Sequence, residues 1–143
     1  MGQGVYTSQA QCLAEELDIG LDNVIAAHAP ADQANYANPV FTIQATGGST
    51  TTRAWTGPLR KAGATARALL VQAAAARWGV APAGLTTENG IITDTASGRS
   101  IRYGDVADQA AGLQPPAGVK HIADGRRPGT KAILFEEIIS IAL

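Results

Sequence analysis

Two glycine-bearing stretches carry the residues best suited to binding a polar ligand. Gln3 lies between Gly2 and Gly4 at the start of the chain, and its carboxamide offers both a hydrogen-bond donor and an acceptor. The second stretch, GGSTTTR, runs from Gly47 to Arg53. Glycines let backbone amides approach a ligand, and the unpaired N–H groups at the start of a following helix attract an anion. Each stretch therefore predicts a place where the backbone meets a phosphate or a polar ring.

Neither stretch is specific on its own. No Gly-Lys-Ser/Thr follows the second turn at P-loop spacing, and its glycines do not have the order of a dinucleotide fingerprint. A plain helix cap also explains this turn, which consists of Gly47, Gly48, Ser49 and Thr50. Arg53, one turn into the helix, is either a cation for a bound anion or a member of a surface ion pair. The first stretch alone has the sequence of a frayed terminus.

The other reactive side chains form no recognisable catalytic or metal-binding pattern. Cys12 is the only cysteine, which excludes an internal disulfide and a cysteine-based zinc or iron–sulfur site. His28 and His121 are far apart, and Ser49 lacks the G-x-S-x-G elbow of hydrolases. The glutamates, Glu16 among them, are expected on solvated helix faces. We therefore assign no catalytic residue and no metal ligand.

Composition indicates one globular domain. The 143 residues are 45% hydrophobic but only 5% aromatic, so the core must consist mainly of aliphatic side chains. Eleven basic residues against twelve acidic ones argue against nucleic acid as a partner. No run approaches the roughly 20 apolar residues of a membrane-spanning helix, and no signal-peptide pattern begins the chain. We expect no membrane insertion and a cytoplasmic location for this chain.

Helix and strand signals predict an α+β fold. One helix is expected from a capping box at residues 8–11 to Gly20, and another from the hydroxyl residues 49–52 to Trp78, with a kink or restart at Pro58. Short strands are expected at 23–27, 85–88, 90–93 and 100–103, a short helix at about 105–111, and loops at 30–46 and 112–118. The predicted architecture has two layers, a small mixed sheet packed against two main helices, with an irregular C-terminal tail.

Several stretches, taken in order, resemble one enzyme family over about residues 1–112. The resemblance rests on MGQGVYTSQAQCLAEELDI, HAPADQANYANPVFTIQATGGSTTTR, ARWGVAP and TENGIITDTASGRSIRYGDVA. These resemble the large, molybdopterin-binding subunit of the xanthine dehydrogenase family. They look nearest to the branch that contains the beta subunit of isoquinoline 1-oxidoreductase and the membrane-associated aldehyde dehydrogenases.

The resemblance implies a cofactor and its contacts. Residues 2–4 match a Gly-Gln-Gly loop whose glutamine faces the molybdenum ligands and the pterin, and the later turn matches a loop on another side of the cofactor. The two turns should therefore face a common pocket. The implied cofactor is molybdopterin, as a cytosine dinucleotide form, and molybdenum in the complete enzyme hydroxylates a carbon of an aldehyde or N-heterocycle. With Arg53 added, the predicted cofactor-binding residues are Gly2, Gln3, Gly4, Gly47, Gly48, Ser49, Thr50 and Arg53.

The chain also departs from the family. Family subunits are several times longer, with other cofactor loops and a catalytic glutamate that has no counterpart here. We therefore expect a fragment truncated at both ends, with a partial molybdopterin-binding domain at 1–112 and a linker and non-family tail at 113–143.

The expected function is that of a cofactor-binding segment that is inactive alone. Its expected partners are the remaining loops of the molybdenum subunit and an iron–sulfur subunit or domain, in a parent enzyme that could be periplasmic. One alternative is a non-catalytic, homo-oligomerising or interaction module whose hydrophobic tail covers exposed surface. Another is a binder of nucleotides or small anions that uses only residues 47–53.

Overall fold

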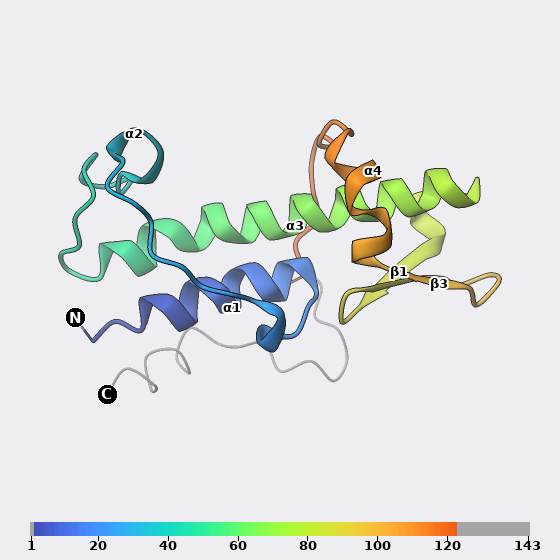
Figure 1. Cartoon of the computed structure of the whole chain (residues 1–143), viewed down its shortest axis with the longest axis horizontal. Helices are drawn as coiled ribbons and strands as arrows, with labels where there is room; N and C mark the ends of the chain where they lie inside the picture. Colours follow the sequence, from blue (N-terminus) through green and yellow to red (C-terminus); the bar gives the residue numbers. More distant parts are fainter. Residues whose placement is uncertain (1, 123–143) are drawn as a thin grey trace.

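The computed structural model describes residues 2–122, arranged along one long helix (Figure 1). Helix α3 (Thr50–Trp78) is 29 residues long, and α1 (Val5–Leu17) packs beside its N-terminal half. A three-stranded sheet and α4 (Ala107–Ala111) lie at its other end. This arrangement confirms the predicted α+β class. None of the described helices is both long enough and apolar enough to cross a lipid bilayer.

Helix α3 has nearly the predicted bounds. It ends where Gly79 adopts the left-handed conformation, with φ 67°, which a glycine accepts without strain. The helix does not restart at Pro58. It continues through this residue as one element. Pro58 has no amide to donate to the Ala54 carbonyl four residues earlier, so the helix lacks this one hydrogen bond but does not end there.

Helix α1 begins and ends earlier than predicted. It starts at Val5, after Gly4 in the left-handed conformation, and the Ser8 hydroxyl donates to the Val5 carbonyl at 3.3 Å instead of forming a capping box. It ends at Leu17 because Asp18, not Gly20, takes the left-handed position with φ 62°. Aspartate tolerates this conformation better than most side chains do, so a glycine was not needed.

Small residues let α1 and α3 approach closely. Ala14 and Ala64 are buried in the contact. A Cβ atom added to Gly63 would lie only 2.6 Å from the Leu13 carbonyl oxygen and 3.0 Å from the Glu16 Cβ atom. The backbones therefore meet where α3 has no side chain, and any larger residue at position 63 would push the helices apart.

The sheet consists of β1 (Leu85–Glu88), β2 (Ile91–Asp94) and β3 (Ser100–Arg102) in that order. Both pairings are antiparallel, so the expectation of a mixed sheet is wrong. The reason is that tight turns join successive strands, and such turns allow only antiparallel neighbours. Asn89 and Gly90 form the first turn with positive φ values, as an Asn-Gly hairpin requires.

The core of this end of the molecule lies between the sheet, α3 and α4. Leu85 and Ile92 of the sheet pack with the following buried residues: Ala73, Ala74, Ala75, Val106 and Ala110. The short 3-10 helices η2 (Pro82–Gly84) and η3 (Tyr103–Val106) flank the strands. Helix α1 meets the sheet only at its end, where the Gly90 amide donates to the Asp18 carbonyl at 2.8 Å. The sheet thus packs mainly on one long helix rather than on two.

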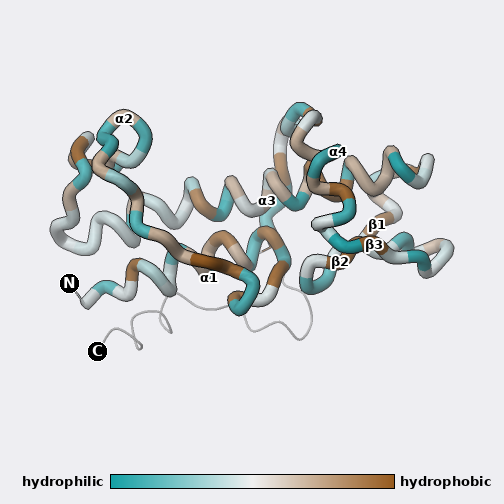
Figure 2. Tube along the Cα trace, viewed as in Figure 1, coloured by the Kyte–Doolittle hydropathy of each residue, from teal (hydrophilic) through white to brown (hydrophobic). Residues whose placement is uncertain are grey.

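The predicted strand at 23–27 has no partner strand within residues 2–122. The 3-10 helix η1 (Leu21–Asn23) occupies its start, and Val24 is extended, with φ −109° and ψ 124°. The chain then continues as an extended segment across α1, where it is mostly hydrophobic (Figure 2). Ile25 is 95% exposed. A strand pattern alone was insufficient here, because a strand also needs a neighbour that completes its hydrogen bonds.

The loop predicted at 30–46 is more ordered than its sequence suggests. It contains α2 (Gln33–Tyr36), which the Asp32 side chain caps by accepting from the Ala34 amide at 3.0 Å. Gln44 closes the loop at its base, since its amide group donates to the Pro30 carbonyl at 2.8 Å and accepts from the Asp32 amide at 2.7 Å. The loop therefore presents a defined surface beside the start of α3.

Candidate functional site

The side chain of Gln3 joins the N-terminal turn to the start of α3. Its Oε1 atom accepts from the Thr52 amide at 3.3 Å and from the Thr52 hydroxyl at 3.1 Å. Thr52 is buried, with 8% of its surface exposed. The two glycine-bearing stretches, separated by more than 40 residues of sequence, therefore contact each other through Gln3 and Thr52.

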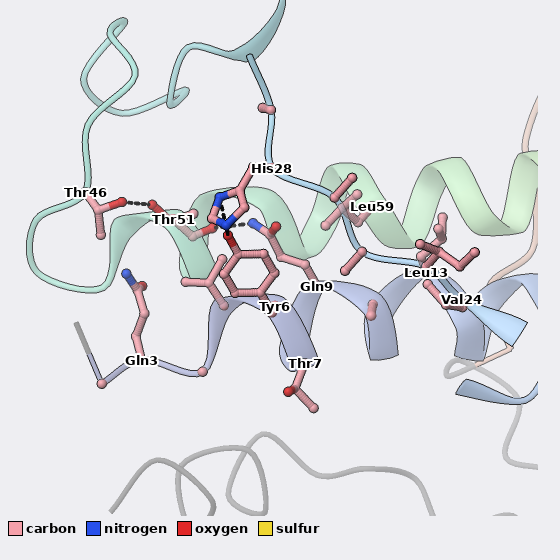
Figure 3. A pocket seen from close by; sticks show the side chains of 18 residues that line it. Gln3, Tyr6, Thr7, Gln9, Leu13, Val24, His28, Thr46, Thr51 and Leu59 are labelled. Atoms are coloured by element: carbon pink, nitrogen blue, oxygen red, sulfur yellow. Dashed lines mark hydrogen bonds between the residues drawn. The ribbon is translucent and has the colours of Figure 1, made fainter. Parts of the chain in front are cut away.

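Two further contacts involve the first turn of α3. The Gln9 side-chain amide of α1 donates to the Thr51 carbonyl at 3.4 Å, and the hydroxyls of Thr46 and Thr51 hydrogen bond to each other (Figure 3). The Gln9 bond positions the first turn of α3 against α1, and the Thr46–Thr51 bond joins the preceding loop to the same turn.

A cavity of about 780 Å³ lies between α1, α3 and the extended segment. This volume is within the range of small-molecule sites. Gln3, Thr46 and Thr51 lie toward one end of the cavity, whereas Leu13, Val24 and Leu59 lie toward the other (Figure 3). Its walls are formed by residues 2–7, 9, 10, 13, 24–29, 46, 51 and 59. The cavity thus combines a polar end with an apolar end.

Only the N-terminal part of the predicted site lines this cavity. Gly2, Gln3 and Gly4 are lining residues, but Gly47, Gly48, Ser49, Thr50 and Arg53 are not. Residues 47–49 form an exposed turn, with positive φ at two of them, and Arg53 is also exposed. Thr50 is buried, where its hydroxyl accepts from the Asn38 side chain at 3.0 Å. The role of these residues toward a cofactor stays a prediction.

Sequence reasoning missed several polar residues of the cavity. The Tyr6 hydroxyl hydrogen bonds to the His28 ring, and the two rings meet edge to face with centroids 4.9 Å apart. Thr46 and Thr51 flank the predicted turn rather than belong to it. No local pattern identifies the Tyr6–His28 contact, because 22 residues separate its members.

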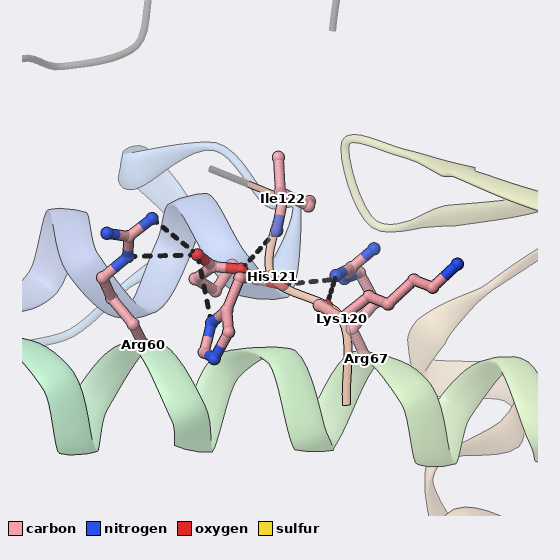
Figure 4. Close-up of polar contacts among 6 residues, drawn as sticks. Arg60, Arg67, Lys120, His121 and Ile122 are labelled. Atoms are coloured by element: carbon pink, nitrogen blue, oxygen red, sulfur yellow. Dashed lines mark hydrogen bonds and ion pairs between the residues drawn. The ribbon is translucent and has the colours of Figure 1, made fainter. Parts of the chain in front are cut away.

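Glu16 is the centre of a second polar cluster, outside the cavity (Figure 4). The side chain is fully buried, and its Oε1 atom accepts from Arg60 Nε at 3.1 Å and from Arg60 Nη2 at 2.9 Å. The Ile122 amide donates to Oε2 at 2.7 Å, and His121 Nδ1 lies 3.4 Å from Oε1. The expectation of a solvated Glu16 is therefore wrong.

The electrostatics of this cluster favour an ionised carboxylate. Burial raises the pKa of Glu16, but hydrogen bonds from Arg60 and the Ile122 amide outweigh burial, so that the pKa lies below its usual value. Arg67 adds a further link, since its Nε donates to the Glu16 carbonyl at 2.8 Å and its Nη2 to the Lys120 carbonyl at 3.0 Å. These hydrogen bonds hold residues 120–122 against α1 and α3, so the cluster has a structural role.

The described side chains provide no metal site of their own. Across residues 2–122, His, Cys, Asp and Glu form no group of three or more that could hold a metal ion. Cys12 is buried, and burial raises the pKa of its thiol, which disfavours the thiolate that metals bind.

Comparison with known proteins gives consistent matches. Residues 1–132 match the model of a molybdopterin cofactor-binding domain. The chain is 39% identical to the beta subunit of isoquinoline 1-oxidoreductase from Brevundimonas diminuta over 122 residues, which are 85% of this chain and 15% of that protein. It is 33% identical to the B subunit of nicotinate dehydrogenase from Pseudomonas putida over 140 residues, 92% of this chain and 11% of that protein.

These matches cover residues on both sides of the predicted boundary at residue 112, and they cover only part of each relative. The chain spans 15% and 11% of the lengths of the two relatives. The family match runs past residue 112, where the sequence predicts that the cofactor-binding segment ends. That boundary, and the assignment of 113–143 to a non-family tail, stay predictions.

Proposed function

This chain belongs to the molybdopterin cofactor-binding domain family, and we propose that its described residues form one wall of a molybdopterin site in a molybdenum hydroxylase. The contact between Gln3 and Thr52, beside the 780 Å³ cavity, is the observation that carries the proposal. Two loops that the resemblance assigns to different sides of one cofactor are adjacent here. This adjacency is what a shared cofactor requires.

The residues of the wall fit the chemistry of a pterin with an attached phosphate. Gln3 Oε1 is engaged by Thr52, so the Nε2 end of the carboxamide is the part available to donate to a ligand. The exposed turn at 47–49 precedes a 29-residue helix, whose start suits a phosphate oxygen. Because the Thr50 amide donates to the Gly47 carbonyl and the Thr52 amide to Gln3, the amides of residues 48, 49 and 51 are the donors for such an oxygen. The apolar end of the cavity suits a ring system. When bound, the cofactor supplies the molybdenum that hydroxylates a carbon centre.

We propose an N-heterocycle or an aldehyde as the substrate of the complete enzyme. The two relatives are named for isoquinoline and nicotinate, which are both nitrogen heterocycles. The aldehyde option rests on the resemblance to the aldehyde dehydrogenase branch. The form of the cofactor in this proposal is the cytosine dinucleotide, as the resemblance implies.

The complete enzyme in this proposal contains other polypeptide segments. Both relatives are named as subunits, which supports the need for partners. We propose that the partners supply the remaining cofactor loops, the catalytic glutamate and the iron–sulfur clusters, and that the parent enzyme works in the cytoplasm or periplasm. Two loops enclose too little of so large a ligand, so we expect no turnover from this chain alone.

A second candidate function is a non-catalytic interaction module, which forms homo-oligomers or binds another chain. It is favoured by the exposure of large apolar side chains that a monomer usually buries. Among them are Ile25 at 95%, Val40 at 57% and Ile43 at 49% exposed. In this function the apolar surface itself is the binding site, and no cofactor is involved.

Cofactor content separates the two functions. The chain is coexpressed, in a host that makes molybdopterin, with a second polypeptide that carries the remainder of a relative's sequence. Molybdenum is measured by mass spectrometry of the purified complex, and pterin by the fluorescence of its oxidised form. Both are expected in the complex. A complex that forms but contains neither would contradict the proposed site and leave the interaction module.

A further inference from the structure

Asn38 is a buried polar residue in the loop that precedes α3. Only 3% of its surface is exposed. Its Nδ2 atom donates to the Ala45 carbonyl at 3.1 Å and to the Thr50 hydroxyl at 3.0 Å. A carboxamide nitrogen carries two hydrogens, so these two bonds use its whole donor capacity. One nitrogen atom thus ties the end of the loop at Ala45 to the first residue of α3.

The other polar groups of Asn38 give the loop its shape. Its Oδ1 atom accepts from the Val40 amide at 2.9 Å, and its own amide donates to the Ile43 carbonyl at 2.9 Å. Its carbonyl accepts from the Phe41 amide at 3.1 Å and from the Thr42 amide at 2.8 Å. Residues 40–43 are all exposed, so this part of the loop depends on Asn38 rather than on a buried side chain of its own.

Both residues that the Asn38 nitrogen holds are next to a residue of the cavity wall. Ala45 directly precedes Thr46, and Thr50 directly precedes Thr51. Thr46 and Thr51 line the polar end of the cavity, where their hydroxyls hydrogen bond to each other (Figure 3). Asn38 itself does not line the cavity. It can therefore affect a ligand there only through the residues that it holds.

The two threonine hydroxyls are suited to a ligand with polar groups. One hydroxyl donates to the other, so the accepting hydroxyl keeps its own hydrogen for a ligand. The side chain of Gln3 lies at the same end of the cavity. Hydrogen bonds weaken steeply when their distance and angle depart from the ideal. A displacement of Thr46 or Thr51 would therefore weaken ligand binding even in a protein that stays folded.

We propose that Asn38 is a positioning residue of the cavity, which holds Thr46 and Thr51 together so that their hydroxyls meet the polar part of a bound molybdopterin. The identity of the ligand rests on the proposed function. The effect of Asn38 on the two threonines does not, because it is a property of the cofactor-free chain. Asn38 therefore acts at one remove from the ligand, and its role can be tested with and without a cofactor.

NMR of the cofactor-free full chain tests the positioning itself. The observable is the nuclear Overhauser effect between the side chains of Thr46 and Thr51. Asn38→Ala should abolish it, because the bonds to Ala45 and Thr50 are lost. Asn35→Ala is the matched control, since Asn35 is an exposed asparagine of the same loop whose side chain bonds to Asp32, and it should preserve the effect. A Thr46–Thr51 contact that survives Asn38→Ala would overturn the proposal.

Variants of Thr50 keep the test valid if Asn38→Ala does not fold. Thr50 is buried and does not line the cavity. Thr50→Val removes the hydroxyl that Asn38 holds and nearly keeps the shape of the side chain, whereas Thr50→Ser keeps the hydroxyl. In the cofactor-free chain, the Thr46–Thr51 contact should be lost in Thr50→Val and present in Thr50→Ser. Its presence in both variants would overturn the proposal.

Cofactor retention tests the consequence for the ligand. The rate at which pterin leaves the coexpressed complex is measured after dilution, by the fluorescence of its oxidised form. Release from Thr50→Val should be about tenfold faster than from the wild type, the effect of one hydrogen bond, and Thr50→Ser should restore the wild-type rate. Equal rates in the wild type and Thr50→Val, or a rate in Thr50→Ser as fast as in Thr50→Val, would overturn the proposal. A wild-type complex without pterin would instead contradict the proposed function, and the NMR comparison would then decide the role of Asn38.

Discussion

Arg60 of α3 donates two hydrogen bonds to the fully buried carboxylate of Glu16 in α1. The pair joins the two helices that form one side of the cavity. Because 30% of the Arg60 side chain stays exposed, Arg60 can reach water if its partner is lost, whereas the buried Glu16 cannot. Replacing Arg60 therefore leaves a buried charge on Glu16, whereas replacing Glu16 leaves a charge on Arg60 that water can reach.

Arg60→Ala should destabilise the protein strongly. Removing one partner of a buried ion pair typically costs about 3–5 kcal/mol, and the Ile122 amide, which still donates to Oε2, should keep the loss toward the lower end of this range. Urea unfolding at neutral pH measures the change in the free energy of unfolding. Arg77→Ala is the control, since Arg77 is exposed near the end of α3 and donates only to the Asp105 carbonyl. Equal losses in the two variants would show that Glu16 does not depend on Arg60.

Stability should fall in acid partly because of Glu16. Its pKa is lowered from the usual value of 4.5 in the folded protein, so ionised Glu16 contributes stability that is fully present above this value. The contribution is lost as the pH falls below about 4.5 and through the lowered folded-state pKa. The free energy of unfolding of the wild type should therefore decrease more steeply between pH 5 and 3, about the span of this titration, than that of Glu16→Gln. Parallel pH profiles would contradict the assignment.

Gly63→Ala should destabilise the contact between α1 and α3. The added methyl group would lie 2.6 Å from the Leu13 carbonyl, and overpacking of this kind costs roughly 1–3 kcal/mol. Gly57→Ala is the matched control, because position 57 is in the same helix and has open space around it. There, the gain in helix propensity from alanine, up to about 1 kcal/mol, is opposed by the clash of its Cβ atom with the ring of Pro58, so we expect little net change. Thermal unfolding should show a clear loss of stability for Gly63→Ala alone, and equal shifts in the two variants would refute the close helix contact.

Local signals in the sequence predicted the bounds of α3 and the three paired strands well. Gly79 sets the end of α3 by adopting the left-handed conformation, whereas the predicted start at residues 49–52 is correct although the Ser49 side chain makes no capping hydrogen bond. The Asn89-Gly90 turn likewise fixes the first hairpin. These features depend on short-range chemistry, which a single sequence displays directly.

Features that depend on distant residues could not be predicted in the same way. Glu16 has the sequence context of a surface residue, and only the fold brings Arg60, 44 positions later, against it. The extended segment at Val24 has a strand pattern but no partner strand within residues 2–122. The family resemblance was needed to expect that Gln3 and the start of α3 approach each other, because neither turn specifies the other locally.

The central claim is that Gln3, held by Thr52, contacts a bound molybdopterin, and cofactor content in a Gln3 variant tests it most directly. Pterin and molybdenum per protein are measured in the coexpressed complex for the wild type, Gln3→Ala and the control Gln11→Ala, whose residue is on α1 but does not line the cavity. Loss of one ligand hydrogen bond should weaken binding up to about tenfold, so Gln3→Ala should lose most of its cofactor when the apparent affinity limits loading. Gln11→Ala should match the wild type. Equal cofactor content in all three proteins would contradict the claim.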